Sequence, residues 1–291
     1  MHYATYLYEG NECAGVVSNE GFYPFKALFG KDMTMLEFIR EHESINLGKL
    51  PLDQHSPIPQ AKLTPLAPIP RPFRHVICLG KNYEDHAKEV METIQSNQNA
   101  NLIPQAPIYF TKTACPAIGD GGTVSVHSNV TQKADYEAEL AVIIGKTASR
   151  ISRQDAESVI FGYTIVNDLT ARDLQAKHSQ WFFGKSLDGF CPMGPVIVSR
   201  DEIPFPVELE IKCRVNCEQR QSSNTSYLIF DIPHVISELS QGITLHPGDI
   251  IATGTPAGIG HAMKPAQYLK AGDVVECEIE KIGVLTTRFG H

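Results

Sequence analysis

The sequence lacks three features that would assign it to a class at once. No apolar run approaches the roughly 18 residues that a membrane-spanning helix needs. The opening residues, MHYATYLYEGNE, carry an acid at Glu9 and no basic stretch, unlike a secretory signal. No cluster of lysine and arginine occurs along the chain, whose formal charge is −8. We therefore expect a cytoplasmic protein that spans no membrane and binds no nucleic acid.

Cysteine pairs with the spacing of a metal site or a disulfide framework are also absent. The seven cysteines are odd in number and scattered, and none forms a C-x-x-C pair. Only Cys191, in GFCPMGP, has a glycine-rich setting, and no histidine near it in sequence is placed to activate a catalytic thiol. We expect most of the cysteines to be small buried hydrophobic residues.

Proline divides the chain into two unequal parts. The segment 50–72 holds seven prolines and little periodic pattern, which is typical of an extended connector. We expect a small N-terminal α/β module over 1–70, with one helix capped by Asp32 or Thr34, and a catalytic domain over 71–291. In the second part, short strand patterns are dense and do not alternate regularly with helices, which argues against Rossmann and TIM architectures.

The fold predicted from this pattern is mixed α+β and β-rich, built on a rolled, mixed β-sheet. Its clearest helices are expected to begin at Ser152, in SRQDAESVIFG, and at Asp231, in DIPHVISELSQG.

A row of acids opens one of the predicted strands. In DYEAELAVIIG (135–145), side chains alternate faces, so Asp135, Glu137 and Glu139 project on one side and repel one another. A second apolar strand, in GYTIVNDLTARD, ends in Asp168. Two interpretations remain open on these residues alone: a solvated strand face, or carboxylates that converge on Mg²⁺ or Mn²⁺.

Six ordered blocks give the chain a resemblance to a known family. Together they are similar to the fumarylacetoacetate hydrolase family over about residues 76–288. The blocks are KNYEDHAKE (81–89), PIYFTK (107–112), DYEAELAVIIG (135–145), GYTIVNDLTARDLQ (162–175), GKSLDGFCPMGP (184–195) and GDIIATGTPAGIG (248–260). The resemblance implies that Glu137, Glu139 and Asp168 hold Mg²⁺ or Mn²⁺, which would be the positive partner that the row of acids requires.

The same resemblance assigns further residues to the site. Lys185 is implied as an active-site lysine that stabilises an oxyanion or enolate, although by itself it would be read as a surface lysine. Arg172 and Gln175 are implied near the substrate, Arg172 as a two-pronged partner for a carboxylate. Thr253 and Thr255 are implied as donors to a substrate carboxylate, and the segment TGTPAGIG lacks the GK[ST] ending of a phosphate loop. Lys112 has the same implied role, against the common case of a solvated lysine at a strand end.

His86 and Glu89 complete the predicted machinery. Their i, i+3 spacing places them on one face of a helix, where the carboxylate can orient the imidazole. The family resemblance implies that the pair acts on water and lies on a mobile lid. The polar run METIQSNQNANLIPQ that follows has the composition of a flexible loop and suits a lid.

The function implied is metal-dependent C–C bond hydrolysis of an acylpyruvate-type 2,4-dioxo acid to pyruvate and a carboxylic acid. The alternatives are decarboxylation of oxaloacetate or a related β-keto acid, and isomerisation of a 2-oxo-enoic diacid, since both pass through the same enolate. A hypothesis of another class is a catalytically silent binding protein that retains the fold. The expected partner is a small-molecule 2-oxo carboxylate, and the family resemblance implies a homodimer.

Overall fold

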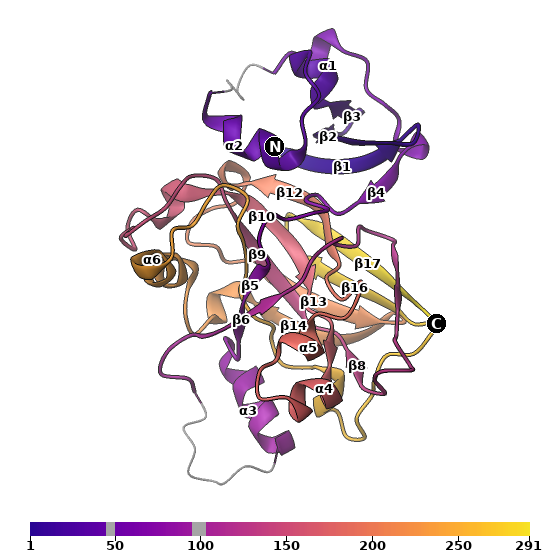
Figure 1. The fold of residues 1–291 in the computed structure, drawn as a ribbon, viewed down its shortest axis with the longest axis vertical. Coiled ribbons are helices and arrows are strands. Elements are labelled where there is room, and N and C mark those ends of the chain that lie inside the picture. Colours follow the sequence, from indigo (N-terminus) through magenta and orange to yellow (C-terminus); the bar gives the residue numbers. More distant parts are fainter. Residues whose placement is uncertain (45–49, 95–102) are drawn as a thin grey trace.

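The computed structural model describes residues 1–44, 50–94 and 103–291, and it has the strand-rich, mixed α+β architecture that the sequence predicts. Two sheets form its body (Figure 1). The larger sheet has ten strands, and the smaller has five. In spatial order the larger sheet contains β3 (Gly21–Pro24), β2 (Asn11–Ser18), β1 (His2–Tyr8), β12 (Met193–Ser199), β10 (Ile160–Asn167), β9 (Ala138–Ile144), β15 (Ile250–Ala252), β5 (Val76–Gly80) and β6 (Ile108–Lys112), and β4 (Thr64–Leu66) pairs with β1.

The smaller sheet packs against the larger one, and a short ribbon lies beside them. Both sheets are mixed, because β15 runs parallel to β5 and β17 runs parallel to β7 while the other neighbours are antiparallel. The smaller sheet contains β14 (Glu218–Asn224), β13 (Glu210–Val215), β16 (Val274–Ile279), β17 (Gly283–Gly290) and β7 (Thr123–Ser125), and the ribbon pairs β11 (Thr170–Ala171) with β8 (Ala134–Asp135).

Helices are short and lie outside the sheets. In Figure 1, α3, α4 and α5 gather at the end of the molecule away from the N-terminal strands. The described residues contain no helix that is both long and apolar enough to cross a membrane. The helices are α1 (Phe25–Phe29), α2 (Met35–Glu41), α3 (Glu84–Ile94), α4 (Arg172–Lys177), α5 (Phe182–Lys185) and α6 (Ile232–Gly242).

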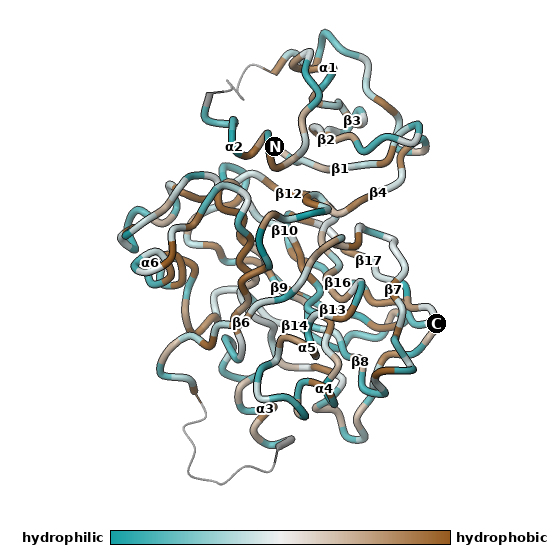
Figure 2. Tube along the Cα trace, viewed as in Figure 1, coloured by the Kyte–Doolittle hydropathy of each residue, from teal (hydrophilic) through white to brown (hydrophobic). Residues whose placement is uncertain are grey.

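The strands β9 and β10 lie at the centre and are buried along their whole length. Side chains of β9 alternate between two hydrophobic clusters: Leu140 and Val142 pack toward the smaller sheet, and Ala141 and Ile143 pack toward the N-terminal strands. Because both faces are covered, the sequence shows a continuous apolar run instead of alternation. Figure 2 shows the same concentration of hydrophobic segments in the interior.

The N-terminal residues extend the central sheet. Strand β1 pairs with β12 through His2 and Tyr3. The ring centroids of Tyr3 and Phe161 of β10 lie 5.2 Å apart, and those of Phe38 of α2 and Phe161 lie 6.0 Å apart. The proline-rich segment is more than a connector, because β4 within it pairs with β1. The division into two domains at residue 70 stays a prediction. The larger sheet contains strands from both sides of this boundary, because β1 pairs with β12.

Two of the three predicted helices form as expected. Thr34 caps α2 in a capping box with Glu37, and Asp231 caps α6 by accepting the N–H of His234. The helix predicted at Ser152 is wrong: Ser152 and Asp155 make the capping contacts, but only a 3₁₀ turn follows, at Ala156–Val159. The apolar residues after it join β10, whose pairing with β9 and β12 outweighs a short local helix.

One strand of the smaller sheet has no hydrophobic signature. β14 reads EQRQSSN and forms a hairpin with β13, and Asn216 and Cys217 between them both have positive φ, as a tight hairpin turn requires. Sequence periodicity does not predict this strand, and it carries Gln221 into the site described below.

We predict that Phe161→Ala destabilises the whole chain by about 3–5 kcal/mol, because it opens a cavity between the N-terminal aromatic rings and β10. Urea unfolding followed by both fluorescence and circular dichroism measures the loss. The exposed Tyr227 supplies a control, since Tyr227→Ala removes little buried surface. A Phe161→Ala protein as stable as the wild type would contradict the packing described for the N-terminal module.

Candidate metal centre

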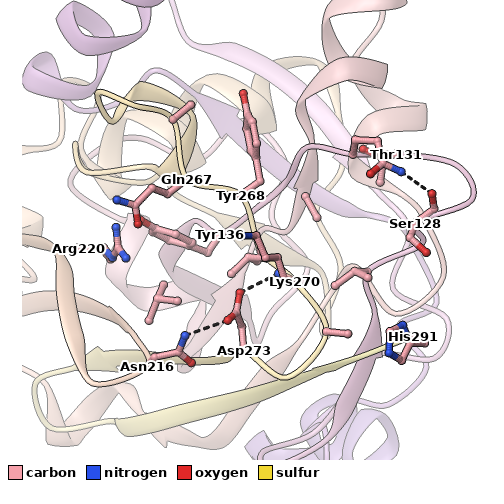
Figure 3. A pocket seen from close by; sticks show the side chains of 17 residues that line it. Ser128, Thr131, Tyr136, Asn216, Arg220, Gln267, Tyr268, Lys270, Asp273 and His291 are labelled. Carbon is pink, nitrogen blue, oxygen red and sulfur yellow. Dashed lines mark hydrogen bonds between the residues drawn. The ribbon is translucent and has the colours of Figure 1, made fainter.

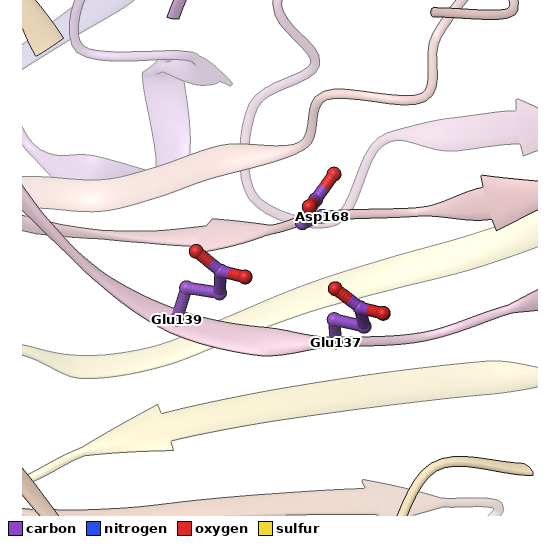
Figure 4. Close-up of side chains that lie close together, drawn as sticks. All are labelled: Glu137, Glu139 and Asp168. Carbon is purple, nitrogen blue, oxygen red and sulfur yellow. The ribbon is translucent and has the colours of Figure 1, made fainter. Parts of the chain in front are cut away.

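Three carboxylates meet where the two central strands pair. Glu139 lies in β9, Glu137 lies just before it, and Asp168 follows β10. The backbone N–H of Asp168 donates to the carbonyl of Glu137 at 2.8 Å, so the antiparallel register sets the strand ends side by side. One oxygen from each carboxylate lies within 4.8 Å of the others, and all three residues are buried (Figure 4).

Asp135, the first acid of the predicted row, has a separate role. Its carboxylate accepts hydrogen bonds from Arg172 Nε at 2.8 Å and from the backbone N–H groups of Gly260 and His261 at 2.9 and 3.0 Å. It therefore ties α4 and the loop 258–261 to the strand that carries the glutamates.

Basic side chains also reach the triad, which corrects the expectation that a metal ion is its only positive partner. Lys185 Nζ lies 2.7 Å from Glu137 Oε2 and 2.6 Å from Asp168 Oδ2. Arg172 contacts the other oxygen of Glu137 at 2.6 Å, and Lys112 lies 3.0 Å from Asp168 Oδ1. The family resemblance places all three cations in the site, but only the tertiary fold shows that they pair with the acids.

The cations set the charge states of their partners. Burial alone would raise the pKa of Glu137, but the charges of Lys185 and Arg172 outweigh it and hold that pKa at about 2. Burial likewise lowers the pKa of Lys185, yet Asp168 and Glu137 raise it above its usual range. Glu137 and Lys185 are therefore both ionised at neutral pH.

Glu139 is the acid of the triad that lacks a cation. Its Oε2 accepts the backbone N–H of Gly254 at 2.9 Å, and no basic side chain among the described residues forms an ion pair with it. Burial, followed by repulsion from Asp168 and Glu137, raises the pKa of Glu139 well above its usual range. A divalent cation would relieve this cost.

The donor set fits a hard divalent cation. Three buried carboxylates offer only oxygen ligands, which favour ions such as Mg²⁺ or Mn²⁺ over zinc. Asp168 Oδ1 has no hydrogen bond of good geometry despite the nearby Lys112 ammonium, so this oxygen retains coordinating capacity. Glu137, Glu139 and Asp168 are the residues that could hold the ion.

A cavity of about 170 Å³ opens beside the triad. Its lining brings together residues from α3, α4, α5 and the loop after β15. Of the predicted site residues it includes His86, Glu137, Glu139, Arg172, Gln175, Lys185 and Thr255; residues not predicted for the site include Lys81, Phe110, Trp181, Ile259 and His261.

Lys112 and Thr253 do not line this cavity. Lys112 is fully buried, and its ammonium donates to the carbonyl oxygens of Leu169, Lys185 and Phe190 as well as pairing with Asp168. The hydroxyl of Thr253 donates to the carbonyl of Leu140 at 2.9 Å. The structure therefore gives both residues partners within the protein, and their predicted contact with substrate finds no support in this geometry.

His86 and Glu89 lie together on α3, as their spacing predicts. His86 Nδ1 lies 3.3 Å from Glu89 Oε2, and the other oxygen of Glu89 accepts the N–H of Gly258 at 2.9 Å. Glu89 thus orients the imidazole and holds α3 against the loop that follows β15. Of the polar run predicted as a lid, residues 91–94 belong to α3, and residues 95–102 lie outside the described residues.

Gln221 is a positioning residue that the sequence analysis missed. Its Oε1 accepts the N–H of Ala138, the residue between the two glutamates, at 3.1 Å, and its Nε2 donates to Thr255 Oγ1 and to the carbonyl of Pro256, each at 2.8 Å. The Thr255 hydroxyl in turn donates to the carbonyl of Ala138. Side chains therefore satisfy both backbone groups of Ala138, which fixes the orientation of Glu137 and Glu139.

Cys191 does not belong to the chemistry. It is buried, and burial raises the pKa of its thiol to about 12, so a reactive thiolate does not form at neutral pH. This agrees with the sequence-based interpretation of the cysteine as a hydrophobic residue.

A larger cavity of about 620 Å³ is lined in part by residues 266–271 (Figure 3). Asp273 is the single acid among the described residues that line it, and it is hydrogen-bonded to Asn216 and to the N–H of Lys270. Two further cavities, of about 760 Å³ each, are larger still, so size does not identify the site. The small cavity beside the triad combines acids that could hold a metal with a histidine that could move a proton.

Comparisons with known proteins agree with this geometry. Residues 75–290 match a family model described as fumarylacetoacetate (FAA) hydrolase, C-terminal. The chain is 50% identical to oxaloacetate tautomerase YisK of Bacillus subtilis (strain 168) over 224 residues, 77% of this chain and 72% of that protein.

Two solved structures extend the likeness to the full length. A fumarylacetoacetate hydrolase from psychrophilic Exiguobacterium antarcticum has a TM-score of 0.86 at 41% identity, covering 100% of this chain and 99% of that one. A maleylpyruvate hydrolase from Sphingobium sp. SYK-6, solved with manganese(II) and pyruvate, has a TM-score of 0.80 at 31% identity and covers 100% of both chains.

We predict that Glu139→Gln abolishes metal binding without destabilising the metal-free protein. Gln keeps the shape and an acceptor for Gly254 while removing the one unpaired buried charge, so the metal-free melting temperature should be at least that of the wild type. At a Mg²⁺ or Mn²⁺ concentration of 100 times Kd, the wild type should gain about 2.7 kcal/mol and the variant none.

Differential scanning fluorimetry with and without EDTA measures both effects, and the exposed Glu208→Gln serves as the matched control. An equal metal-dependent shift in Glu139→Gln and the wild type would remove Glu139 from the ligand set.

Proposed function

The chain belongs to the fumarylacetoacetate hydrolase family, and from this membership and the site we propose a Mg²⁺- or Mn²⁺-dependent tautomerase that interconverts the keto and enol forms of oxaloacetate. The observation that carries the proposal is one small cavity containing two acids of the triad together with a histidine oriented by a carboxylate. From the sequence, C–C hydrolysis is the first expectation, with oxaloacetate decarboxylation or isomerisation of a 2-oxo-enoic diacid as alternatives; keto–enol tautomerisation of oxaloacetate is not among them. The 50% identity to an oxaloacetate tautomerase supports this reaction as the first candidate.

The size of the cavity favours a short substrate. Its volume of about 170 Å³ lies below the roughly 300–1,000 Å³ of pockets for drug-sized ligands. A four-carbon 2-oxo dicarboxylate is among the smallest substrates that carry both a keto group and an acidic C–H bond beside it.

A divalent ion held by Glu137, Glu139 and Asp168 would act as a Lewis acid on the keto group and so make the C3 hydrogen more acidic. Lys185 adds a fixed positive charge beside Glu137 and Asp168, where negative charge would develop on the keto oxygen. Its ammonium is already ordered by two carboxylates, so it pays no reorganisation at the moment of reaction.

His86 is suited to transfer the proton at C3. With Nδ1 donating to Glu89, Nε2 is the ring nitrogen that retains a lone pair, so it can accept a proton from C3. The imidazolium then releases this proton to solvent while the enolate oxygen takes one up from solvent, so the base is regenerated and the net result is the enol, with no σ-bond to carbon broken other than C3–H. The reverse sequence returns the keto form.

Arg172 is suited to hold the carboxylate beside the keto group. Asp135, Glu137 and Gln175 occupy its Nε and one terminal nitrogen, while the other, Nη2, is buried without a partner. A buried guanidinium nitrogen without an acceptor is costly, and a substrate carboxylate in this cavity would supply one.

Hydrolysis of an acylpyruvate is the second candidate. The maleylpyruvate hydrolase with manganese(II) and pyruvate supports it, and a histidine oriented by a glutamate can also activate water. The distal carbonyl and a water molecule would both have to fit beside the metal in the same small cavity. Oxaloacetate decarboxylation is the third candidate: the C3–C4 bond breaks in place of C3–H, CO₂ leaves, and the enolate formed is that of pyruvate.

We predict that the protein speeds the decay of the enol form of oxaloacetate in Mg²⁺ or Mn²⁺, and that it exchanges the C3 hydrogens for deuterium in D₂O. The ultraviolet absorbance of the enol and proton NMR measure the two effects, and a lactate dehydrogenase assay for pyruvate counts decarboxylation separately. Glu139→Gln is the inactive control. Pyruvate released from an acylpyruvate faster than enol decay would put hydrolysis first, and neither activity in the presence of bound metal would favour a silent binding protein.

We predict that His86→Ala and Glu89→Ala each lose roughly 10²-fold or more in rate, and that the double variant loses little beyond this, because the pair acts as one unit. Both single variants should still bind Mg²⁺ by calorimetry, since neither residue belongs to the triad. Additive losses would assign the two residues separate roles.

A further inference from the structure

Lys81 is a cavity residue with no role in the mechanism above. It follows β5 and precedes α3, and it lines the cavity together with His86 and the two glutamates. Its φ of 54° lies in the left-handed region, where a lysine costs of the order of 1 kcal/mol and glycine or asparagine would cost less. The chain therefore retains a long cationic side chain at a backbone position that disfavours it.

The neighbours of Lys81 fix its position. The side chain of Asn82 is buried and donates to the carbonyls of Thr253 and Phe230 at 2.8 and 3.0 Å, and it accepts the N–H of Phe230 at 2.8 Å. Asn82 also lies against Gly254, where an added Cβ would stand 2.9 Å from Asn82 Cβ. Since Gly254 donates to Glu139, the backbone at Lys81 is anchored next to the loop that holds Glu139, whereas Arg172 contacts Glu137.

Lys81 differs from the other cavity cations in having no acidic partner. Lys185 and Arg172 are each held by two carboxylates. Within residues 1–44, 50–94 and 103–291, the ammonium of Lys81 makes no hydrogen bond or ion pair, and its side chain is half-buried. Its charge is thus available to a ligand.

The charge balance of the site indicates the sign and the size of the charge that the ligand carries. In the ion-pair network, Asp135, Glu137 and Asp168 are matched by the three cations Lys112, Arg172 and Lys185. Glu139 remains, so a divalent ion leaves a single positive charge, which one carboxylate of a substrate would neutralise. The charge of Lys81 is then matched by a second carboxylate.

We propose that Lys81 determines specificity for 2-oxo dicarboxylates by pairing with the carboxylate distal to the keto group. This inference rests on the proposed function and names the residue that separates a dicarboxylate from a 2-oxo monocarboxylate at the same metal. Arg172 serves the carboxylate beside the keto group, and Lys81 serves the far end. A charge-assisted hydrogen bond of this kind contributes about 1.5–3 kcal/mol, or roughly 10- to 150-fold in affinity.

Calorimetry in saturating Mg²⁺ tests the proposal with two ligands that differ at the far end: pyruvate, and 3,3-difluorooxaloacetate, which has no C3 hydrogen and cannot enolise. Lys81→Met should lose at least 10-fold in affinity for the dicarboxylate and less than twofold for pyruvate. Lys81→Arg should restore most of the loss, and Lys81→Asn, which tolerates positive φ, should repeat the effect of methionine if folding is intact. The exposed Lys62→Met is the matched control.

The kinetic counterpart is a rise in KM for oxaloacetate with little change in kcat, since distal binding is uniform along the reaction. Equal losses for both ligands, or none for either, would overturn the role of Lys81 and leave the tautomerase proposal standing. If the wild type binds the dicarboxylate through Lys81 but has no tautomerase activity, the tautomerase proposal is overturned and the role of Lys81 in binding stands. A wild type that binds neither ligand in Mg²⁺ would overturn both.

Discussion

Three buried carboxylates within 4.8 Å of one another repel, and the side chains around them compensate that repulsion only in part. Two of them are compensated from within the protein, Glu137 by Lys185 and Arg172, and Asp168 by Lys185 and Lys112. Glu139 has only a backbone N–H. The fold thus leaves one acid of the triad without a cation, and this is the acid whose charged form a divalent ion would stabilise.

Local geometry accounts for two of the groupings that the sequence predicts and the structure shows. Strand alternation puts Glu137 and Glu139 on one side, and helical spacing puts His86 beside Glu89. Local geometry cannot predict that the cations pair with the acids, because Lys185 is 48 residues from Glu137 along the chain. Lys112 was assigned to substrate for the same reason: its carbonyl partners come from segments far away in sequence.

Polar residues that serve the backbone are the hardest to predict. Gln221 lies on a strand without apolar periodicity, since the groups it faces are the N–H of Ala138, the hydroxyl of Thr255 and the carbonyl of Pro256. A turn motif at Asn216 and Cys217 could have revealed the hairpin that carries Gln221. This turn has positive φ at both residues but lacks the glycine that usually marks such a turn in a sequence. Lys81 is hidden similarly, because its positive φ is a property of the folded chain.

The two ends of the site rest on different parts of the fold, a division that would let one metal centre serve several reactions. The three acids of the triad sit at the ends of β9 and β10, which are buried on both faces and cannot shift without disturbing two hydrophobic clusters. Lys81 and His86 belong instead to the short segment that leaves β5 and forms α3, held to the loop after β15 by Asn82 and Glu89. Under the proposed function, the core would fix the enolate chemistry. The segment 81–94 would set which group is accepted beyond C3, and whether the histidine meets carbon or water there, and it can vary without moving an acid of the triad.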